Sequence, residues 1–394
     1  MAGGSPPPLV LFGAFDRHNL GDLLLGHVAA RLCAPRTTIA AGLRRCDLGA
    51  SGGHAVVPIS SLDEAVDVLH VGGELLCCEA YQAAVMLESP AAAARIVARL
   101  DRDREAATAW ARQRIGTVRH LPYLFPTGDR GRRLYAGIGG TTLDRLPAAA
   151  RGEAIDAMRA ADGLWVRDAR TQGHLAAAGV TAPLAPDPAV LVAALFGHRI
   201  GRRLGALSAL RHRFANGYLA LQLSADCGDD ATLDVLAAQI ARASARHGLG
   251  VVMFCAGRAP WHDDVEPYHR LLRRIPGDGM VHDAHDMWTL CALVAASCAT
   301  VATSLHARIV AEAFARPALS LTCGAAGAAK LEAYFGTWAR EPTRWLVPPD
   351  QLADALPAAL AVPGRQRAAY AAAQAAAARA AWRMLLERLR QARA

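Results

Sequence analysis

The sequence has 394 residues, a length that predicts about two domains and argues against a single small module. Hydrophobic residues make up 53% and charged residues 20%, so the chain can bury substantial cores and a disordered chain is excluded. The net charge of +8 is too small on this length to indicate nucleic-acid binding by itself. Most of the excess lies in residues 364–394, where seven arginines accompany a single acid, Glu387.

The nine cysteines are scattered and form no C-x-x-C pair, which indicates reduced thiols rather than a disulfide framework or a zinc site. Residues 1–8 lack the charged and apolar regions of a signal peptide. The most apolar stretch, Met287–Ala302, is interrupted by Thr289, Ser297 and Thr300, a pattern typical of a helix and a buried strand rather than a membrane span. We therefore expect a cytoplasmic protein.

Short apolar runs alternate with alanine-rich segments along the whole chain, as in α/β proteins with mostly parallel sheets. The alternation weakens over the arginine-rich residues 197–216, which we interpret as a linker. The sequence thus predicts two Rossmann-like, doubly wound domains over 1–196 and 217–362, facing across a ligand cleft, and a basic amphipathic helix over 363–394. The expected strands are Leu9–Phe12, Val56–Ile59, Val68–Val71, Leu134–Ile138, Leu164–Val166, Tyr218–Leu223, Gly250–Cys255, Met280–Val281, Thr300–Thr303 and Ala318–Leu321.

Glycine-bearing turns follow several strands of the first half. Asn19, Gly21 and Asp22 come after the first strand, and Gly72 and Gly73 come after the run Val68–Val71. Such turns let a ligand approach the backbone at a helix N-terminus, although Asp22 as a helix cap and the glycines as packing positions explain the pattern equally simply. No G-x-G-x-x-G fingerprint is present, which disfavours a dinucleotide site.

Two further candidates stand near the end of the first domain. Arg167 closes a strand and precedes Asp168, a natural helix cap. Asp187 stands between two prolines, which stiffen the segment and fix the direction of its side chain. Arg167 either faces the cleft or forms a surface salt bridge, and for Asp187 a functional role and a hinge role both remain open.

The most specific cluster follows the expected strand Thr300–Thr303. Ser304 is a natural helix cap before Leu305, so His306 and Arg308 fall in the first turn, where the helix dipole opposes cations unless an anion is bound. The alternative is that Arg308 pairs with Glu312 four residues on. Lys330 is the only lysine of the chain. The loop 262–264, a histidine and two aspartates, either contacts an acceptor hydroxyl or only solvent.

Taken together, these pieces resemble the polysaccharide pyruvyl transferase family. The resemblance covers residues of about 10 to 335 in the family's order, through the Asn19–Asp22 turn, Gly72 and Gly73, Arg167, Asp187 and the Ser304-Leu305-His306 motif up to Lys330. It implies a GT-B-like fold and transfer of the pyruvyl group of phosphoenolpyruvate onto glycan or lipid-linked sugar hydroxyls as a ketal. Many family members carry arginine where this chain has Ser304, so Arg308 or another cation must then bind the donor carboxylate.

The residues suit such chemistry. Phosphoenolpyruvate is strongly anionic, and Arg167, Arg308, Lys330 and a helix N-terminus supply positive groups. A histidine with a pKa near neutrality is the natural general acid for the vinyl carbon, a role we assign to His306. The route requires no metal and no cofactor. Two alternatives remain open: a GT-B glycosyltransferase that uses a nucleotide-sugar, and a non-catalytic relative in polysaccharide assembly.

The C-terminal helix carries an apolar stripe of Trp382, Leu385, Leu386 and Leu389, opposed by arginines. The stripe either packs against the first domain or lies on the inner face of an anionic membrane as a peripheral contact.

Overall fold

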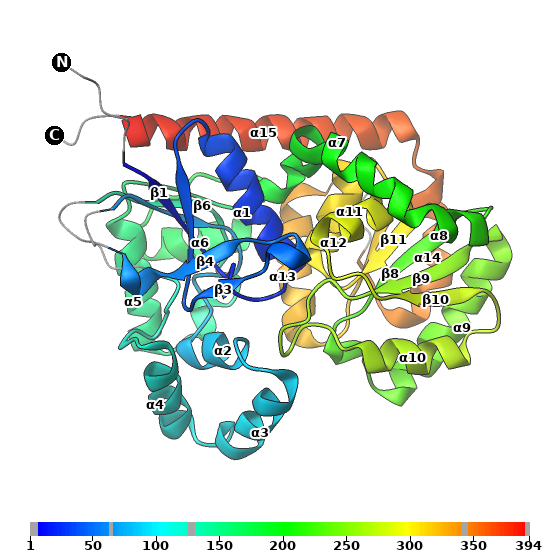
Figure 1. The fold of residues 1–394 in the computed structure, drawn as a ribbon, viewed down its shortest axis with the longest axis horizontal. Coiled ribbons are helices and arrows are strands. Elements are labelled where there is room, and N and C mark those ends of the chain that lie inside the picture. The colour runs from blue at the N-terminus through cyan, green and yellow to red at the C-terminus, as the bar shows by residue number, and fades with distance from the viewer. Residues whose placement is uncertain (1–6, 63–65, 125–130, 340–345, 391–394) are drawn as a thin grey trace. The chain divides into compact units, whose positions relative to one another are not determined.

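The computed structural model describes residues 7–62, 66–124, 131–339 and 346–390, without the side chains of residues 325 and 326. The chain divides into two compact units, which we call unit 1 and unit 2 (Figure 1). Unit 1 comprises Met1–His18, Asp22–Pro188 and Ala377–Ala394, and unit 2 comprises Asn19–Gly21 and Ala189–Ala376.

Unit 1 is built on one sheet with the strand order β3-β4-β2-β1-β5-β6-β7. Its pairs are parallel except β3 with β4. Strands such as β1 and β6 are buried along their whole length, because helices cover both faces of a parallel sheet. The strands are β1 (Leu9–Phe12), β2 (Thr38–Gly42), β3 (Cys46–Asp47), β4 (Ala55–Pro58), β5 (Val68–Val71), β6 (Arg133–Ile138) and β7 (Gly163–Val166).

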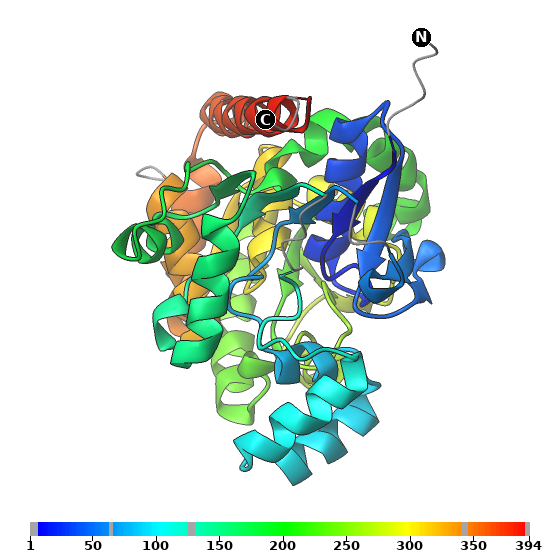
Figure 2. The ribbon, with the colours of Figure 1, turned by 90° about the vertical axis from the view of Figure 1, so that its left-hand side faces the viewer.

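The helices of unit 1 include a pair, α3 and α4, that lie side by side away from the sheet (Figure 2). Ser89 and Asp103 cap these two helices with their side chains. The helices are α1 (Leu20–Cys33), whose first residues are grouped with unit 2, α2 (Ala80–Val85), α3 (Pro90–Leu100), α4 (Arg104–Ile115), α5 (Ala148–Arg159) and α6 (Ala169–Ala177), with short 3-10 turns at Gly49–Ser51, Ile59–Ser61 and Leu143–Arg145.

Unit 2 has an entirely parallel sheet in the order β10-β9-β8-β11-β12-β13. This is the order of a Rossmann fold, and the winding direction reverses between β8 and β11. The strands are β8 (Tyr218–Gln222), β9 (Gly250–Phe254), β10 (Gly279–His282), β11 (Ala299–Ala302), β12 (Ala318–Leu321) and β13 (Leu346–Val347).

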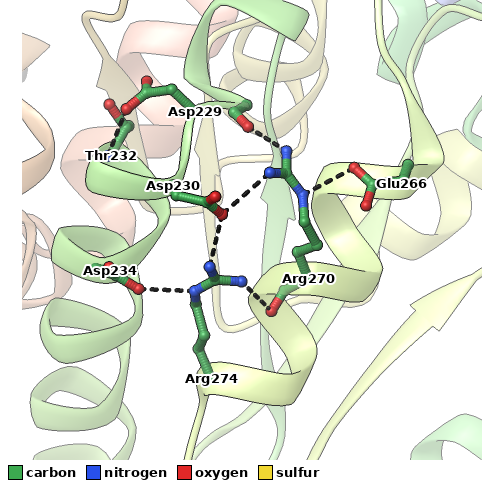
Figure 3. Close-up of polar contacts among 8 residues, drawn as sticks. Asp229, Asp230, Thr232, Asp234, Glu266, Arg270 and Arg274 are labelled. Atoms are coloured by element: carbon green, nitrogen blue, oxygen red, sulfur yellow. Dashed lines mark hydrogen bonds and ion pairs between the residues drawn. The ribbon is translucent and has the colours of Figure 1, made fainter.

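Two helices of unit 2, α9 and α10, are joined by a network of ion pairs (Figure 3). Asp230 of α9 accepts from Arg270 at 3.0 Å and from Arg274 at 2.6 Å, and Arg274 also contacts Asp234 at 2.7 Å. Asp230 and Asp234 are both 66% exposed, so solvent screens each pair and its contribution to stability is small. The helices of unit 2 are α7 (Val192–Arg203), α8 (Ser208–Arg213), α9 (Asp230–His247), α10 (Val265–Arg274), α11 (Met287–Ala296), α12 (Leu305–Ala313), α13 (Ala325–Trp338) and α14 (Leu352–Ala361), with 3-10 turns at Pro188–Leu191, Leu204–Leu207, Ala225–Cys227 and Pro349–Gln351.

The long helix α15 (Gly364–Arg390) ends the described chain and contributes to both units. Its apolar stripe is used for packing within unit 1: Trp382 is 1% exposed and meets Trp165 edge to face at a centroid distance of 5.3 Å. Leu385 is also buried, against Gly163. These side chains are therefore not available to a membrane, and the alternative of a peripheral contact through this stripe receives no support.

The predicted fold class is confirmed: two Rossmann-like units with parallel sheets are followed by a C-terminal helix. Residues 197–216, interpreted as a linker, lie largely in α7, α8 and the turn between them. Within the described residues, every helix is too short or too polar to cross a membrane.

Candidate functional site

Unit 2 gathers polar groups where its strand order reverses, the place at which open α/β sheets bind ligands. Gln222 ends β8 and is 1% exposed. Its amide oxygen accepts hydrogen bonds from the Ser304 backbone N–H at 2.7 Å and from the Thr303 hydroxyl at 3.3 Å. Its amide nitrogen donates to Asp263 at 2.9 Å. One buried amide thus links the carboxyl ends of β8 and β11 to the loop after β9.

Asp263 in this cluster titrates near neutrality. Burial raises its pKa to about 7, against the hydrogen bonds from Gln222, Ala256 and Gly257 and the charge of Lys330, all of which lower it. The Ala256 N–H donates to the carboxylate at 2.6 Å. Lys330, on α13, is near enough for its charge to lower the pKa of Asp263. A carboxyl with this pKa exchanges its proton readily at neutral pH.

The α12 helix begins at this cluster. Ser304 is its N-cap, as predicted, and its hydroxyl accepts from the Ala307 N–H at 3.3 Å. The positive end of the helix dipole is therefore directed to the switch point, a favourable position for an anion. Leu305 is 1% exposed and packs in the core, so its side chain does not contact a ligand. His306 lies in the first turn.

The segment Asn19–Gly21 belongs to the same unit. A Cβ atom on Gly21 would lie 1.9 Å from Nδ1 of His306, so only glycine fits against this ring. Asn19 forms an isolated bridge with Gly257, and its amide nitrogen lies 3.4 Å from both ring nitrogens of His262. The structure therefore brings Asn19, Gly21, Ser304 and His306 together in unit 2, and the charge of Lys330 acts on Asp263 in the same unit.

A disulfide joins two loops of unit 2 at the carboxyl ends of β8 and β12. Cys227 and Cys323 form the bond. Gly324, the residue after Cys323, lies close to Asp226, and a Cβ atom on Gly324 would be 2.7 Å from the Asp226 carboxylate. The prediction that all the cysteines are reduced is therefore wrong. The error arose because residues separated by 96 positions become neighbours only through the sheet order.

Arg308 is directed into the core of unit 2. Its guanidinium pairs with Glu312 at 2.9 Å, donates to the Ser320 hydroxyl at 3.1 Å and stacks 3.6 Å from the centre of the Phe335 ring. Burial raises the pKa of Glu312, and the charge of Arg308 opposes this. With no part of Arg308 exposed, the structure matches the alternative of an i,i+4 pair.

Arg167 lies in unit 1, where it also serves an internal network. Its guanidinium contacts Glu74 at 2.6 Å and Asp187 at 2.8 Å, and both Arg167 and Asp187 are at most 2% exposed. Burial tends to lower the pKa of Arg167, but the two carboxylates outweigh it and raise it. Asp168 caps α6 as predicted, accepting from the Thr171 N–H at 2.7 Å. This network fixes the ends of β5 and β7.

Gly72, Gly73 and Asp22 also belong to unit 1. Both glycines have positive φ, +55° and +77°, and a Cβ on Gly72 would lie 2.3 Å from Leu25, so backbone shape and helix packing require them. Since α1 begins at Leu20, Asp22 lies in its first turn instead of at the cap. Its carboxylate is 3.6 Å from the Arg17 guanidinium.

Sequence reasoning did not single out Gln222 or Asp16. Gln222 is a polar residue that ends the apolar strand Tyr218–Leu221, and that contrast was a usable signal. Asp16 follows β1, is 1% exposed and accepts from the Leu43 and Arg44 N–H groups at 2.6 and 3.1 Å. Two adjacent charges, Asp16 and Arg17, directly after a buried strand were the corresponding signal in unit 1.

Structural comparison shows the GT-B fold over nearly the whole chain. UDP-GlcNAc 2-epimerase from Neisseria meningitidis, solved with UDP-GlcNAc, has a TM-score of 0.51 at 10% identity and covers 97% of this chain and 98% of its own. A trehalose-6-phosphate synthase has a TM-score of 0.52 at 11% identity (98% and 100%), and HepE of Anabaena, solved with UDP, has 0.50 at 11% (98% and 100%). No protein-family model matches the sequence, and no curated protein is similar to it.

These findings overturn the first functional prediction. Transfer of pyruvyl from phosphoenolpyruvate is contradicted, because the similar structures include an epimerase solved with UDP-GlcNAc and HepE solved with UDP, and these agree better with the alternative that uses a nucleotide-sugar. The geometry gives a physical reason. Arg308 and Arg167, which were to neutralise the donor, are neutralised by carboxylates inside their own units.

Proposed function

We propose that the chain is a glycosyltransferase that takes a nucleotide-sugar donor, with the diphosphate bound at the switch point of unit 2. The observation that carries the proposal is the cluster around Gln222, where the capped start of α12 lies at the carboxyl ends of parallel strands and the charge of Lys330 reaches Asp263. Solved structures of the same fold hold UDP-GlcNAc and UDP, which supports the choice of donor class.

The charges of this site suit a diphosphate. The helix dipole of α12 and the ammonium of Lys330 supply positive potential, and Ser304 fixes the first turn from which backbone N–H groups point outward. The imidazole ring of His306 packs against Gly21 and lies in the same first turn of α12. Asp263 holds Gln222 in place through its hydrogen bond, so the shape of the strand end depends on that carboxyl.

The proposal is tested by isothermal titration of the full chain with UDP, ADP and GDP, and with phosphoenolpyruvate for comparison. We expect saturable binding of at least one nucleoside diphosphate and none of phosphoenolpyruvate. His306→Ala and Lys330→Gln should each weaken binding about tenfold or more, because a hydrogen bond to a charged group contributes about 1.5–3 kcal/mol.

Arg273→Gln is the matched control, since Arg273 is an exposed cation on α10 outside the cluster. Equal binding by the control and by the two site variants would place the ligand elsewhere and contradict the proposal, as would the absence of binding by all three diphosphates.

A further inference from the structure

Unit 2 contains a hollow at the amino ends of its strands, the end of the sheet opposite to the candidate site. It lies where β12 begins, beside the end of α12 and the start of α15, and it is a partly open hollow with a cavity volume of about 30 Å³. Its polar lining includes Arg316, Arg367 and Glu312, and its apolar walls include Pro317, Ala359 and Val362. None of these residues belongs to the cluster around Gln222.

Two guanidinium groups face this hollow with no carboxylate partner among the described residues. Arg316 donates through Nε to the carbonyl of Ala295 at 2.6 Å, and Arg367 donates through Nε to the carbonyl of Ala315 at 2.8 Å. Both arginines line the same hollow, and burial, followed by the charge of Arg316, lowers the pKa of Arg367. A pair of like charges held together beside a cavity favours a bound anion.

The lining also includes one acid, Glu312. Glu312 is 15% exposed on its side chain and its carboxylate already pairs with Arg308 at 2.9 Å. Its charge is therefore compensated by Arg308 and does not neutralise Arg316 or Arg367. Pro317, Ala359 and Val362 give the hollow apolar walls, which favour a ligand with an apolar part.

We propose that this hollow binds a small organic monocarboxylate, with the carboxylate between Arg316 and Arg367 and a short apolar chain against Pro317, Ala359 and Val362. A carboxylate matches the planar guanidinium geometry, and an alkyl tail of a few carbons suits the walls. The site is independent of the proposed nucleotide-sugar activity, although α12 connects the two ends of unit 2: it begins at Ser304 and carries Glu312 in its last turn.

The test measures binding of butyrate to the full chain by isothermal titration and by the shift of the melting temperature. Butyramide, which has the same chain without the charge, and inorganic phosphate, which has charge without a chain, are the comparison ligands. We expect saturable binding of butyrate, and weaker or no binding of the other two. Arg316→Gln should weaken butyrate binding about tenfold or more, equivalent to about 1.4 kcal/mol.

Arg365→Gln, an exposed arginine in the same first turns of α15, is the matched control and should bind butyrate like the unaltered chain. Arg367→Gln is the second variant; its melting temperature without ligand separates a loss of folding from a loss of binding. Absence of saturable butyrate binding, or equal binding by Arg316→Gln and Arg365→Gln, overturns the proposal. Tighter binding of phosphate than of butyrate overturns the assignment to a carboxylate.

Discussion

The effect of Asp263→Asn on the free energy of unfolding should change sign as the pH rises. In the native state both carboxylate oxygens of Asp263 accept hydrogen bonds, one from Gln222 at 2.9 Å and one from Ala256 at 2.6 Å. An asparagine keeps one acceptor oxygen and presents an amide donor in place of the other. The substitution therefore removes a charge and disrupts one hydrogen bond, and only the first effect depends on pH.

The magnitude follows from the pKa. Burial raises the pKa of Asp263 to about 7, whereas an unfolded aspartate titrates near its ordinary value of 3.8. A raised carboxyl pKa means that the native state binds the proton more tightly than the unfolded state does. The stabilisation that comes from protonated Asp263 is therefore fully present below about pH 4 and is lost as the pH rises to about pH 7. A rise of roughly three units corresponds to about 4 kcal/mol. The disrupted hydrogen bond costs about 1 kcal/mol at every pH.

We therefore expect Asp263→Asn to be less stable than the unaltered chain by about 1 kcal/mol near pH 4 and more stable by about 3 kcal/mol above about pH 7. Urea unfolding followed by tryptophan fluorescence at a series of pH values measures this difference. Asp264→Asn is the control, because Asp264 is an exposed helix cap that asparagine replaces well. Parallel stability curves for Asp263→Asn and the unaltered chain would refute the reasoning.

Three further predictions concern the interior. Arg308→Gln leaves Glu312 without its ion pair and should destabilise the chain by about 3–5 kcal/mol in urea unfolding. The double variant Arg308→Met with Glu312→Leu should recover much of this loss. Equal losses of stability in the single and the double variant would contradict a buried pair. Trp382→Ala should cost about 3–5 kcal/mol and the exposed Met384→Ala less than about 0.5 kcal/mol, a contrast that a solvent-facing stripe would not give. Cys227→Ala should lower stability by about 2–5 kcal/mol under oxidising conditions, with the difference vanishing when dithiothreitol is present; an unchanged difference would mean that the bond to Cys323 is not the cause.

The fold class was predictable because the buried strands of parallel sheets have sequences of consecutive apolar residues. The expected runs Leu9–Phe12 and Val68–Val71 coincide with β1 and β5. By contrast, β2 and β13 were not predicted, since β2 reads Thr-Ile-Ala-Ala-Gly and β13 has only two residues. Their strand character comes from pairing with distant neighbours, which local composition does not record.

The candidate site was predictable only where local structure decides a role. Ser304 and Asp168 were predicted as caps because a cap depends on the next three residues, and both are caps. The contacts of Gln222 depend on which strands become neighbours, and the disulfide depends on two loops that meet only in the folded sheet. Such long-range contacts have no signature in sequence spacing.

The overwhelming use of arginine explains why the predicted cations proved misleading. A guanidinium is planar and weakly hydrated, so it can be buried if carboxylates and an aromatic face surround it. Arg167 between Glu74 and Asp187, and Arg308 between Glu312 and the Phe335 ring, meet that condition. An ammonium is compact and strongly hydrated, and it cannot replace a guanidinium in such a fork. The single lysine of the chain, Lys330, is only partly buried and acts on Asp263 at the switch point. We therefore expect Lys330→Arg, which keeps the positive charge, to alter the cluster around Gln222, whereas the buried Arg167 and Arg308 stabilise the interiors of their units.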